Sequence, residues 1–238
     1  ADIAPREGGG ELEEEIRWRV LAKEVTIIPL TSDEPGQKHA EVNVKEGQTG
    51  EWSPGFAVSS DSGVIGQMIF EQRNFDISDW PESFDEFISV FWPEPGEPPR
   101  AFRGAGQSLR IALEPGVEVS QYLVSFTEPY FRDKPIALNV RGRSYERELE
   151  SYDLGRLGVY VGFEERYQKR YRERWRKSVG FRVENIDVGN VRSNAPTGIQ
   201  SVKGTNALAG VKFGIRRELV DNRFNPSTGH SFNAGYEQ

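Results

Sequence analysis

TGEWSPGFAVSSDSGVIGQMIFEQRNF, residues 49–75, sets a pattern that most of this chain repeats. Two runs of alternating apolar and polar residues flank the turn Ser60-Asp61-Ser62-Gly63, which is typical of an antiparallel hairpin. Because side chains two residues apart line one face of a strand, the first run places Trp52, Phe56 and Val58 on the same side. The stretch therefore predicts two strands, each with one apolar face.

Similar strands follow this hairpin to the end of the chain, joined by short connections. Alternating segments recur at 107–114, 117–131, 136–143, 157–163, 179–184 and 209–216, and a last strand begins at Ser231. A regular series of this kind predicts an all-β fold. Before the series, residues 24–30 and 40–44 predict two further short strands, joined by a turn rich in Asp, Pro and Gly. We interpret this pair as the end of a small α/β module.

The second face of several strands carries Arg, Lys, Glu and Gly, a mixture that suits the wet interior of a barrel. Alternation alone leaves two folds open, a membrane β-barrel and a soluble β domain, because both alternate apolar and polar faces. Tight turns alternate with longer segments such as 189–206, however, and outer-membrane barrels have short turns on one rim and longer loops on the other. This asymmetry is typical of a barrel, but the pattern alone leaves both folds open.

Composition excludes several classes of protein and several kinds of site. The net charge of −7 argues against a nucleic-acid-binding protein, which is usually basic. The chain has no cysteine, so disulfides, thiolate metal sites and thiol nucleophiles are excluded. It has no apolar run of the roughly 18 residues that a membrane-spanning helix needs. Because it begins at Ala1 without a signal peptide and ends inside an expected strand, we interpret it as a fragment or processed product.

No catalytic residue, cofactor site or metal site can be assigned from these residues. His39 and His230 lie in separate turns, without the converging ligands that a zinc site needs. The basic run at 166–177, RYQKRYRERWRK, allows a nucleic-acid patch, a barrel rim or a solvated hairpin end, and we prefer the last. Residues 77–105 are dense in Pro and aromatic residues. For them we prefer a packed surface loop over an aromatic girdle at a membrane surface.

Five segments together resemble the BamA family of outer-membrane assembly factors, also called the bacterial surface antigen family. They are VKEGQTGEWSPGFAVSSDSGVIG (44–66), EQRNFDI (71–77), AFRGAGQSLRIALEPG (101–116), SFTEPYF (125–131) and FNPSTGHSF (224–232). The resemblance implies a bacterial outer-membrane location and an antiparallel transmembrane β-barrel preceded by POTRA modules. Residues 1–23 would be a linker or part of a POTRA module, 24–48 the last strands of the final module, and 49–238 the first nine or so barrel strands.

The resemblance also implies which way the connections face. The turn at 60–63 and the segments 144–156 and 189–206 would lie outside the cell. The connections 77–105, 132–135, 164–176 and 223–230 would lie in the periplasm. Aromatic side chains at the membrane interface would be Tyr130, Phe131, Tyr167, Tyr171 and Trp175.

The resemblance implies that the protein is not an enzyme and that its function is the folding and insertion of other β-barrel proteins into the outer membrane. In the family the first barrel strand pairs weakly with the last, and its free edge templates incoming strands. Here the pairing residues would be Trp52, Ser53, Pro54, Gly55, Phe56, Ala57 and Val58. Expected partners are unfolded outer-membrane proteins, accessory assembly lipoproteins, periplasmic chaperones and outer-membrane lipid, with no nucleic acid. The alternatives are a related translocation or secretion pore and a soluble β-rich binding or carbohydrate-active domain.

Overall fold

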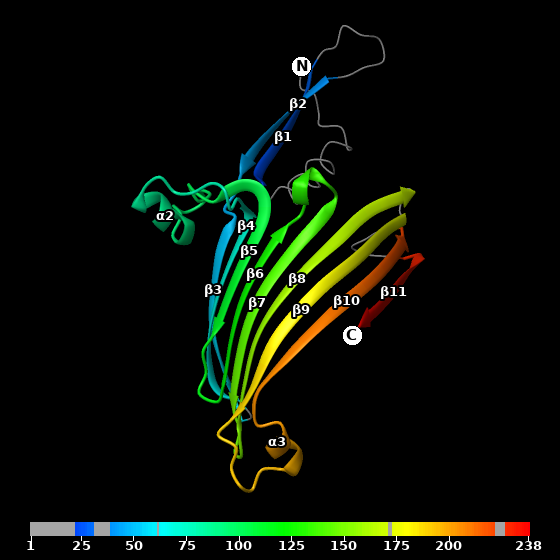
Figure 1. Cartoon of the computed structure of the whole chain (residues 1–238). Coiled ribbons are helices and arrows are strands. Elements are labelled where there is room, and N and C mark those ends of the chain that lie inside the picture. Colours follow the sequence, from blue (N-terminus) through cyan, green and yellow to red (C-terminus); the bar gives the residue numbers. More distant parts are fainter. Residues whose placement is uncertain (1–21, 31–38, 61, 171–172, 222–226) are drawn as a thin grey trace. The chain divides into compact units, whose positions relative to one another are not determined.

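The computed structural model describes residues 22–30, 39–60, 62–170, 173–221 and 227–238 (Figure 1). The elements in chain order are β1 (Ala22–Leu30), β2 (His39–Glu46), β3 (Gly50–Ser59), β4 (Gly63–Phe75), α2 (Phe84–Phe91), β5 (Arg103–Glu114), β6 (Val119–Glu128), the 3-10 turn η1 (Phe131–Asp133), β7 (Ile136–Glu148), β8 (Asp153–Arg170), β9 (Glu173–Gly189), α3 (Thr197–Ser201), β10 (Gly204–Val220) and β11 (Gly229–Glu237). None of the described helices is long and apolar enough to cross a membrane.

The chain divides into two compact units. One consists of residues 1–51 and 72–106, and the other of residues 52–71 and 107–238. In the first unit β1 and β2 form an antiparallel pair, in register from Val25↔Val44 to Leu30↔His39. The strand pair expected at 24–30 and 40–44 is therefore confirmed, while its assignment to a POTRA module stays a prediction. Residues 1–21 lie outside the described part of the chain.

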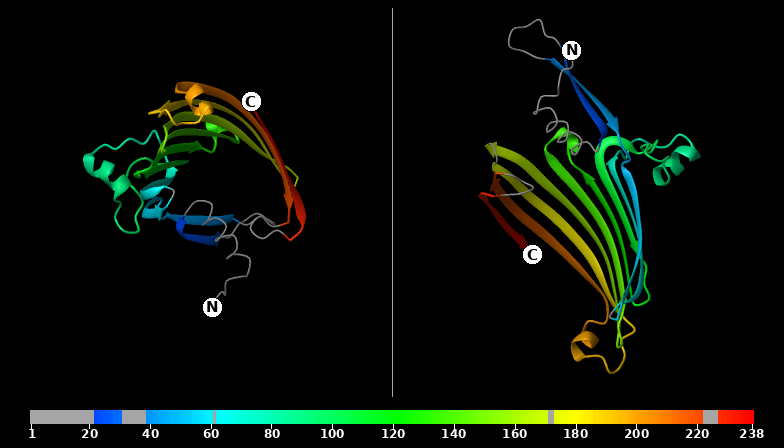
Figure 2. Two further views of the ribbon diagram at one scale, coloured as in Figure 1. Left: turned by 90° about the horizontal axis from the view of Figure 1, so that it is seen from below. Right: turned by 180° about the vertical axis from the view of Figure 1, so that it is seen from behind.

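The second unit consists mainly of a nine-stranded sheet in which every strand lies beside its neighbour in the sequence. The spatial order is β11-β10-β9-β8-β7-β6-β5-β4-β3, and the pairs from β5 to β11 are antiparallel. The sheet is strongly curved, and β3 and β11 form its two edges (Figure 2). The expectation of about nine consecutive antiparallel strands is confirmed.

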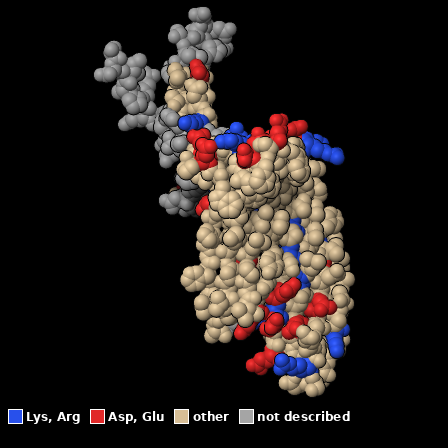
Figure 3. Space-filling view, turned by 90° about the vertical axis from the view of Figure 1, so that its left-hand side faces the viewer, with Lys and Arg blue, Asp and Glu red and all other residues tan. Residues whose placement is uncertain are grey.

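The two faces of this sheet differ in chemistry, because the register aligns apolar residues with apolar residues across the strands. On one face Val161 of β8 pairs with Val140 of β7 and with Phe181 of β9, which in turn pairs with Val211 of β10. Many of these side chains are half exposed, including Val159, Phe181 and Phe213. Figure 3, viewed toward the β3 side, shows uncharged side chains over most of the middle of the strands and charged ones mainly toward their ends.

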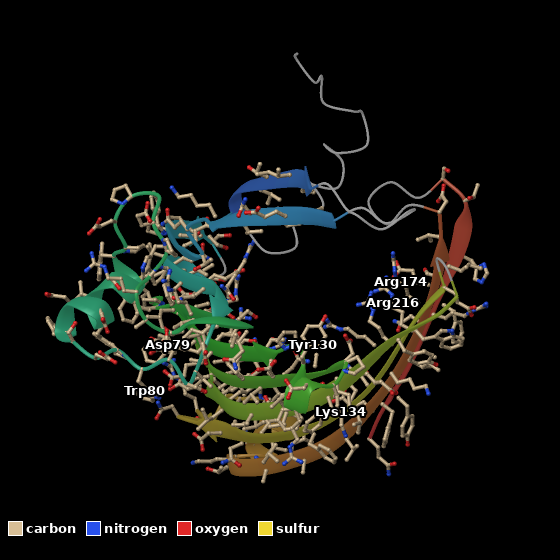
Figure 4. The ribbon with its side chains drawn as sticks, turned by 90° about the horizontal axis from the view of Figure 1, so that it is seen from above. Asp79, Trp80, Tyr130, Lys134, Arg174 and Arg216 are labelled. Atoms are coloured by element: carbon tan, nitrogen blue, oxygen red, sulfur yellow. The ribbon has the colours of Figure 1, made fainter. Side chains whose placement is uncertain are left out.

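The other face carries the polar side chains. Tyr160 of β8 pairs with Arg141 of β7 and Arg182 of β9, and Figure 4 places Arg174 and Arg216 on the concave side of the curve. Since all five residues share one face by strand alternation, the polar face is the concave one. The sheet therefore has a polar inner face and an apolar outer face, as the alternation in the sequence predicts.

Two glycines on the concave face accommodate one tyrosine. A methyl group at Gly162 of β8, or at Gly180 opposite it on β9, would overlap the phenol ring of Tyr160. The ring thus lies across two adjacent backbones that have no side chain of their own. Aromatic residues placed over strand glycines in this way restore packing that the glycines would otherwise leave out.

The strands differ widely in length. β3 has 10 residues, whereas β8 has 18 and β9 and β10 have 17 each. A tilted strand needs about 9–11 residues to cross the hydrocarbon core of a bilayer. β3 is therefore just long enough to cross it, and β8 to β10 are longer than crossing requires.

Two connections expected from the sequence are much shorter in the structure. The segment 164–176, expected as a periplasmic connection, is mostly paired strand in its described residues, because β8 and β9 stay paired to Arg170↔Glu173, with one register shift between Gln168 and Arg170. The segment 144–156, expected as a long outer loop, is paired from Ser144↔Leu157 to Glu148↔Asp153. Main-chain hydrogen bonding continues in both places where the apolar alternation has stopped, so the side-chain pattern marks the strand ends too early.

The long connection after β4 contains a helix, α2, that the alternating pattern did not predict. Around it, Phe102 holds the ends of the connection together: its carbonyl accepts from the Asp76 N–H at 3.0 Å and from Nε2 of the fully buried Gln72 at 3.1 Å. The Phe102 ring stacks on Phe75 with centroids 5.4 Å apart, and Trp80 contacts it edge-on at 5.3 Å. The expectation of a packed loop holds for these ends, while in α2 Phe84 is exposed, Phe87 is partly exposed and Phe91 is half-buried.

Candidate functional site

β3 is one edge of the nine-stranded sheet, with β4 as its neighbour on one side and no strand on the other within the described residues. Its sequence explains why it is a suitable edge. Pro54 has no backbone N–H, so in sheets proline is confined to edge strands, strand starts and bulges. Gly55 weakens the strand further, since it adds no side chain to pack.

The side chains of β3 follow the alternation expected from the sequence. The Trp52 ring packs against Phe70 of β4 with centroids 4.9 Å apart, and Phe56 and Val58 are 82% and 72% exposed. A Cβ at Gly55, on the opposite face, would lie 3.2 Å from the Gln67 Oε1 atom of β4. Gln67 in turn donates to Glu114 of β5 at 2.9 Å. β3 thus has an apolar face beyond Trp52 that is largely uncovered, and a face that meets a polar network.

The aromatic residues expected at a membrane interface gather in two places within the second unit. Phe131, in the turn after β6, contacts Phe163 of β8 edge-on at 5.7 Å, and the Arg132 guanidinium lies 5.4 Å from the Phe131 ring centroid. Tyr130, beside it, is 66% exposed. Figure 4 shows Tyr130 and Lys134 in the connection between β6 and β7.

The second group lies on the β8–β9 ladder. Tyr167 and Trp175 are cross-strand partners with parallel rings 6.3 Å apart. Lys177 lies 5.2 Å from the Tyr167 ring centroid, and Arg217 of β10 lies 5.6 Å from that of Trp175. Arg217 Nε also donates to the buried Glu173 Oε1 at 3.0 Å. Tyr171 lies outside the described residues.

These contacts determine what the basic run at 166–177 is in the structure. Its two described aromatic side chains, Tyr167 and Trp175, stack on the outer face, and Arg166 and Arg176 pair with Glu164 and Glu218. Amphipathic rings flanked by cations are the composition found at the interfaces of membrane barrels. The described part of this run thus forms the end of a hairpin, and its position at a membrane interface stays a prediction.

The concave face holds a pocket of about 430 Å³ between β7, β8, β9, β10 and β11. Its charged lining residues are Arg141, Arg143, Arg156, Arg182, Lys212, Glu184 and Glu237. Arg182 pairs with Glu237 at 2.8 Å and with Glu184 at 3.7 Å. Cations outnumber carboxylates here by five to two, so the pocket is locally basic in a chain that is acidic overall. The sequence showed the mixture of charges but not that these residues meet in one pocket.

Comparison with known proteins identifies the family. The model of the Omp85 superfamily domain matches residues 101–238, which are 138 of the 238 residues. The chain belongs to the Omp85 superfamily. Omp85 membership, together with the fold, makes it a bacterial outer-membrane β-barrel protein.

A solved structure shows the same fold. The chain is similar to BamA from Haemophilus ducreyi, solved without its POTRA domains 1–3, with a TM-score of 0.58 and 15% sequence identity. The match covers 97% of this chain and 42% of that one, so the chain spans about two fifths of the BamA chain that it resembles. No curated protein matches. The membrane location rules out the alternative of a soluble β-rich domain.

Proposed function

We propose that this chain is the N-terminal part of an outer-membrane assembly barrel, which folds and inserts other β-barrel proteins and uses β3 as the strand that pairs with substrate. Omp85 membership supports a role in inserting or translocating proteins at the outer membrane. The observation that carries the finer proposal is that β3 lies at the edge of the sheet and contains Pro54 and Gly55.

The physical basis of the proposal is strand addition. An edge strand presents a row of main-chain donors and acceptors on which an extended segment can form a new ladder. Pro54 removes one donor from that row, and Gly55 lowers the stability of the strand. A pairing made by residues 52–58 is then weak enough to exchange one strand for another. Unfolded outer-membrane proteins are the proposed substrates, with accessory lipoproteins and periplasmic chaperones as proposed partners that deliver them.

Site-specific cross-linking tests this proposal. Because residues 1–238 contain no cysteine, single cysteines at Phe56 and Ala57 provide two unique sites on opposite faces of β3. Val159 of β8 provides the control, since it is half exposed on the outer face but lies inside the sheet. In the full-length protein with a stalled substrate carrying a cysteine in its last strand, we expect adducts at 56 and 57 and none at 159. Equal yields at all three positions, or none at β3, would contradict the proposal.

A second function, a translocation or secretion pore, is favoured by a different observation. The basic concave pocket would line the path of a polypeptide that passes through the lumen. The same cross-linking distinguishes the two, because a substrate in transit would react with cysteines replacing Arg141 or Lys212 and not with those on β3.

A further inference from the structure

α2, the eight-residue helix between β4 and β5, has its apolar side facing outward. Phe84, Phe87, Ile88 and Phe91 follow the i, i+3, i+4, i+7 spacing that aligns side chains along one helix face. On this face Phe84 is 75% exposed, Phe87 41% and Ile88 38%. The buried residues of the helix, Ser89 and Val90, lie on the opposite side. This is the reverse of the usual surface helix, in which the apolar side is buried.

The buried side of α2 is held by polar contacts. Ser89 Oγ donates to the Glu86 carbonyl at 2.6 Å and accepts from the Arg100 N–H at 2.9 Å. These bonds fix the helix to the returning segment of its own unit, with the aromatic side turned away. The outward orientation is therefore set by specific contacts.

The helix is also well formed at its ends. The Ser83 side chain caps it by accepting from the Glu86 N–H at 3.2 Å, and the Glu86 carboxylate accepts from the Glu82 N–H at 2.7 Å. The cap satisfies a backbone donor of the first turn and so stabilises the helix start, and the Glu86 carboxylate adds a contact to the residue before the cap. At the other end the Trp92 N–H donates to the Ile88 carbonyl at 2.9 Å. α2 is thus a helix before any partner is bound.

The rings of Phe84, Phe87 and Phe91 form a continuous apolar strip, in which Phe91 is half-buried. Phe84 and Phe87 stack with centroids 6.4 Å apart, and Phe87 meets Phe91 edge-on at 5.4 Å. Trp92, 73% exposed, follows directly at the end of the helix. Bulky aromatic residues exposed together mark a surface that is covered by something else.

We propose that α2 is a membrane-surface anchor, which inserts this aromatic strip into the bilayer interface at the rim where β4 ends and β5 begins. Three observations favour lipid over a protein partner. The helix lies between the ends of two strands of an outer-membrane sheet. Its exposed face consists of Phe, Ile and Trp, the residues of interfacial helices. Its charged neighbours Asp85 and Glu86 lie off the centre of that face on the helical wheel.

The charge of the segment defines the kind of lipid surface. Residues 76–97 contain seven acidic residues and no Lys or Arg. An anionic surface would repel this segment, whereas a zwitterionic interface admits its aromatic side chains without an electrostatic cost. Insertion is then driven by apolar contact, and it should be insensitive to salt. The proposal does not depend on the role of β3, because it needs only the outer-membrane location.

A fluorescent label tests the proposal in the full-length protein, reconstituted in phosphatidylcholine vesicles whose acyl chains carry bromine. A single cysteine replaces Ile88 on the aromatic strip, and in a matched protein it replaces Glu97, an exposed residue beyond the helix. Each is labelled with an environment-sensitive dye. We expect bromine to quench the label at 88 at least threefold more than the label at 97, and aqueous iodide to show the opposite preference.

Further variants show whether the strip drives insertion. Replacing both Phe84 and Phe87 with Ser should halve the bromine quenching at 88, whereas Asp85→Ser should leave it unchanged. Raising NaCl from low to high concentration should have no effect, and adding phosphatidylglycerol should not increase the quenching.

Three outcomes would overturn the proposal. Iodide quenching at 88 equal to that at 97 would mean that the strip stays in water. Protection of 88 from both quenchers would mean that protein covers the strip. Quenching by bromine that requires phosphatidylglycerol would mean that anionic lipid, rather than apolar contact, drives insertion.

Discussion

The β8–β9 and β3–β4 hairpins follow the same alternating pattern but differ in how firmly they are held. β8 and β9 pair from Asp153↔Gly189 to Arg170↔Glu173, and each has a further strand on its other side. β3 has 10 residues, contains Pro54 and Gly55, and lies at the edge. Pairing is therefore longest in the interior of the sheet, whereas β3 is a short edge strand with two residues that weaken pairing.

The two hairpins also show that side-chain alternation and strand length are separate properties of a strand. On β9 the apolar belt consists of Val179, Phe181 and Val183, and the strand continues for several residues beyond it in both directions. On β3 the apolar residues reach almost to the turn. Side-chain alternation thus reports the part of a strand that faces lipid, while the length of the ladder depends on main-chain pairing.

The largest expected effect comes from placing a charge in the belt of the interior hairpin. Phe181→Arg should lower the free energy of unfolding by about 2–4 kcal/mol, since an arginine on the lipid face at mid-membrane must lose its hydration. Denaturant titration of the protein folded into vesicles measures this. Asn185→Arg, on the same face but nearer the strand end, should cost about 1 kcal/mol or less.

Phe56→Arg on β3 sharpens the comparison. It should cost less than Phe181→Arg, because β3 is an edge strand and can shift to let the guanidinium reach the interface. Equal costs at the two positions would mean that the edge is held as firmly as the interior.

A smaller effect is expected from the concave face. Gly180→Val should destabilise the protein by about 1–3 kcal/mol, because the added atoms overlap the Tyr160 ring and force it to move. Gly142→Val on the outer face of β7 is the comparison, since nothing lies within 4 Å of a Cβ added there. The same titration in vesicles compares them, and a cost at 142 equal to that at 180 would contradict the role of the ring.

The smallest effect on stability, though not on function, is expected at the edge itself. Pro54→Val restores a backbone donor and a β-branched side chain, which should stabilise β3 by about 1 kcal/mol or less. If β3 exchanges partners as proposed, insertion of a substrate barrel into vesicles should slow severalfold. Ser53→Val adds β-propensity without adding a donor, and it should leave the rate unchanged. Similar insertion rates for the wild type, Pro54→Val and Ser53→Val would mean that the weakness of β3 does not contribute to insertion.

Most of the sheet could be predicted from the sequence, because one face is apolar along consecutive strands. The alternation at 157–163 and 209–216 locates two of the longest strands, and the hairpin at 49–75 locates the edge. The extension of β8 and β9 through 164–176 could not be predicted, since Arg and Glu there replace the apolar residues that reveal a strand.

The candidate site was predictable to a similar degree. Pro54 and Gly55 indicate a weak edge through their residue types alone. The pocket on the concave face needed the register, which brings Arg141 and Lys212, 71 residues apart, to one place. The sequence around α2 does contain a helix signal, because Ser83 and Glu86 form a capping box that is followed by apolar residues at helical spacing. That those residues face outward could be learned only from the burial of Ser89.

Tyr160, Gly162 and Gly180 lie on two strands yet share one space, and this has a consequence for how the three positions vary among relatives. While the ring is present, neither glycine can acquire a side chain without overlap. A lineage that shortens Tyr160 releases both glycines at once, and one that gains a branched residue at 180 must already have lost the ring. The three positions should therefore change together over evolutionary time, as a covarying group that spans β8 and β9.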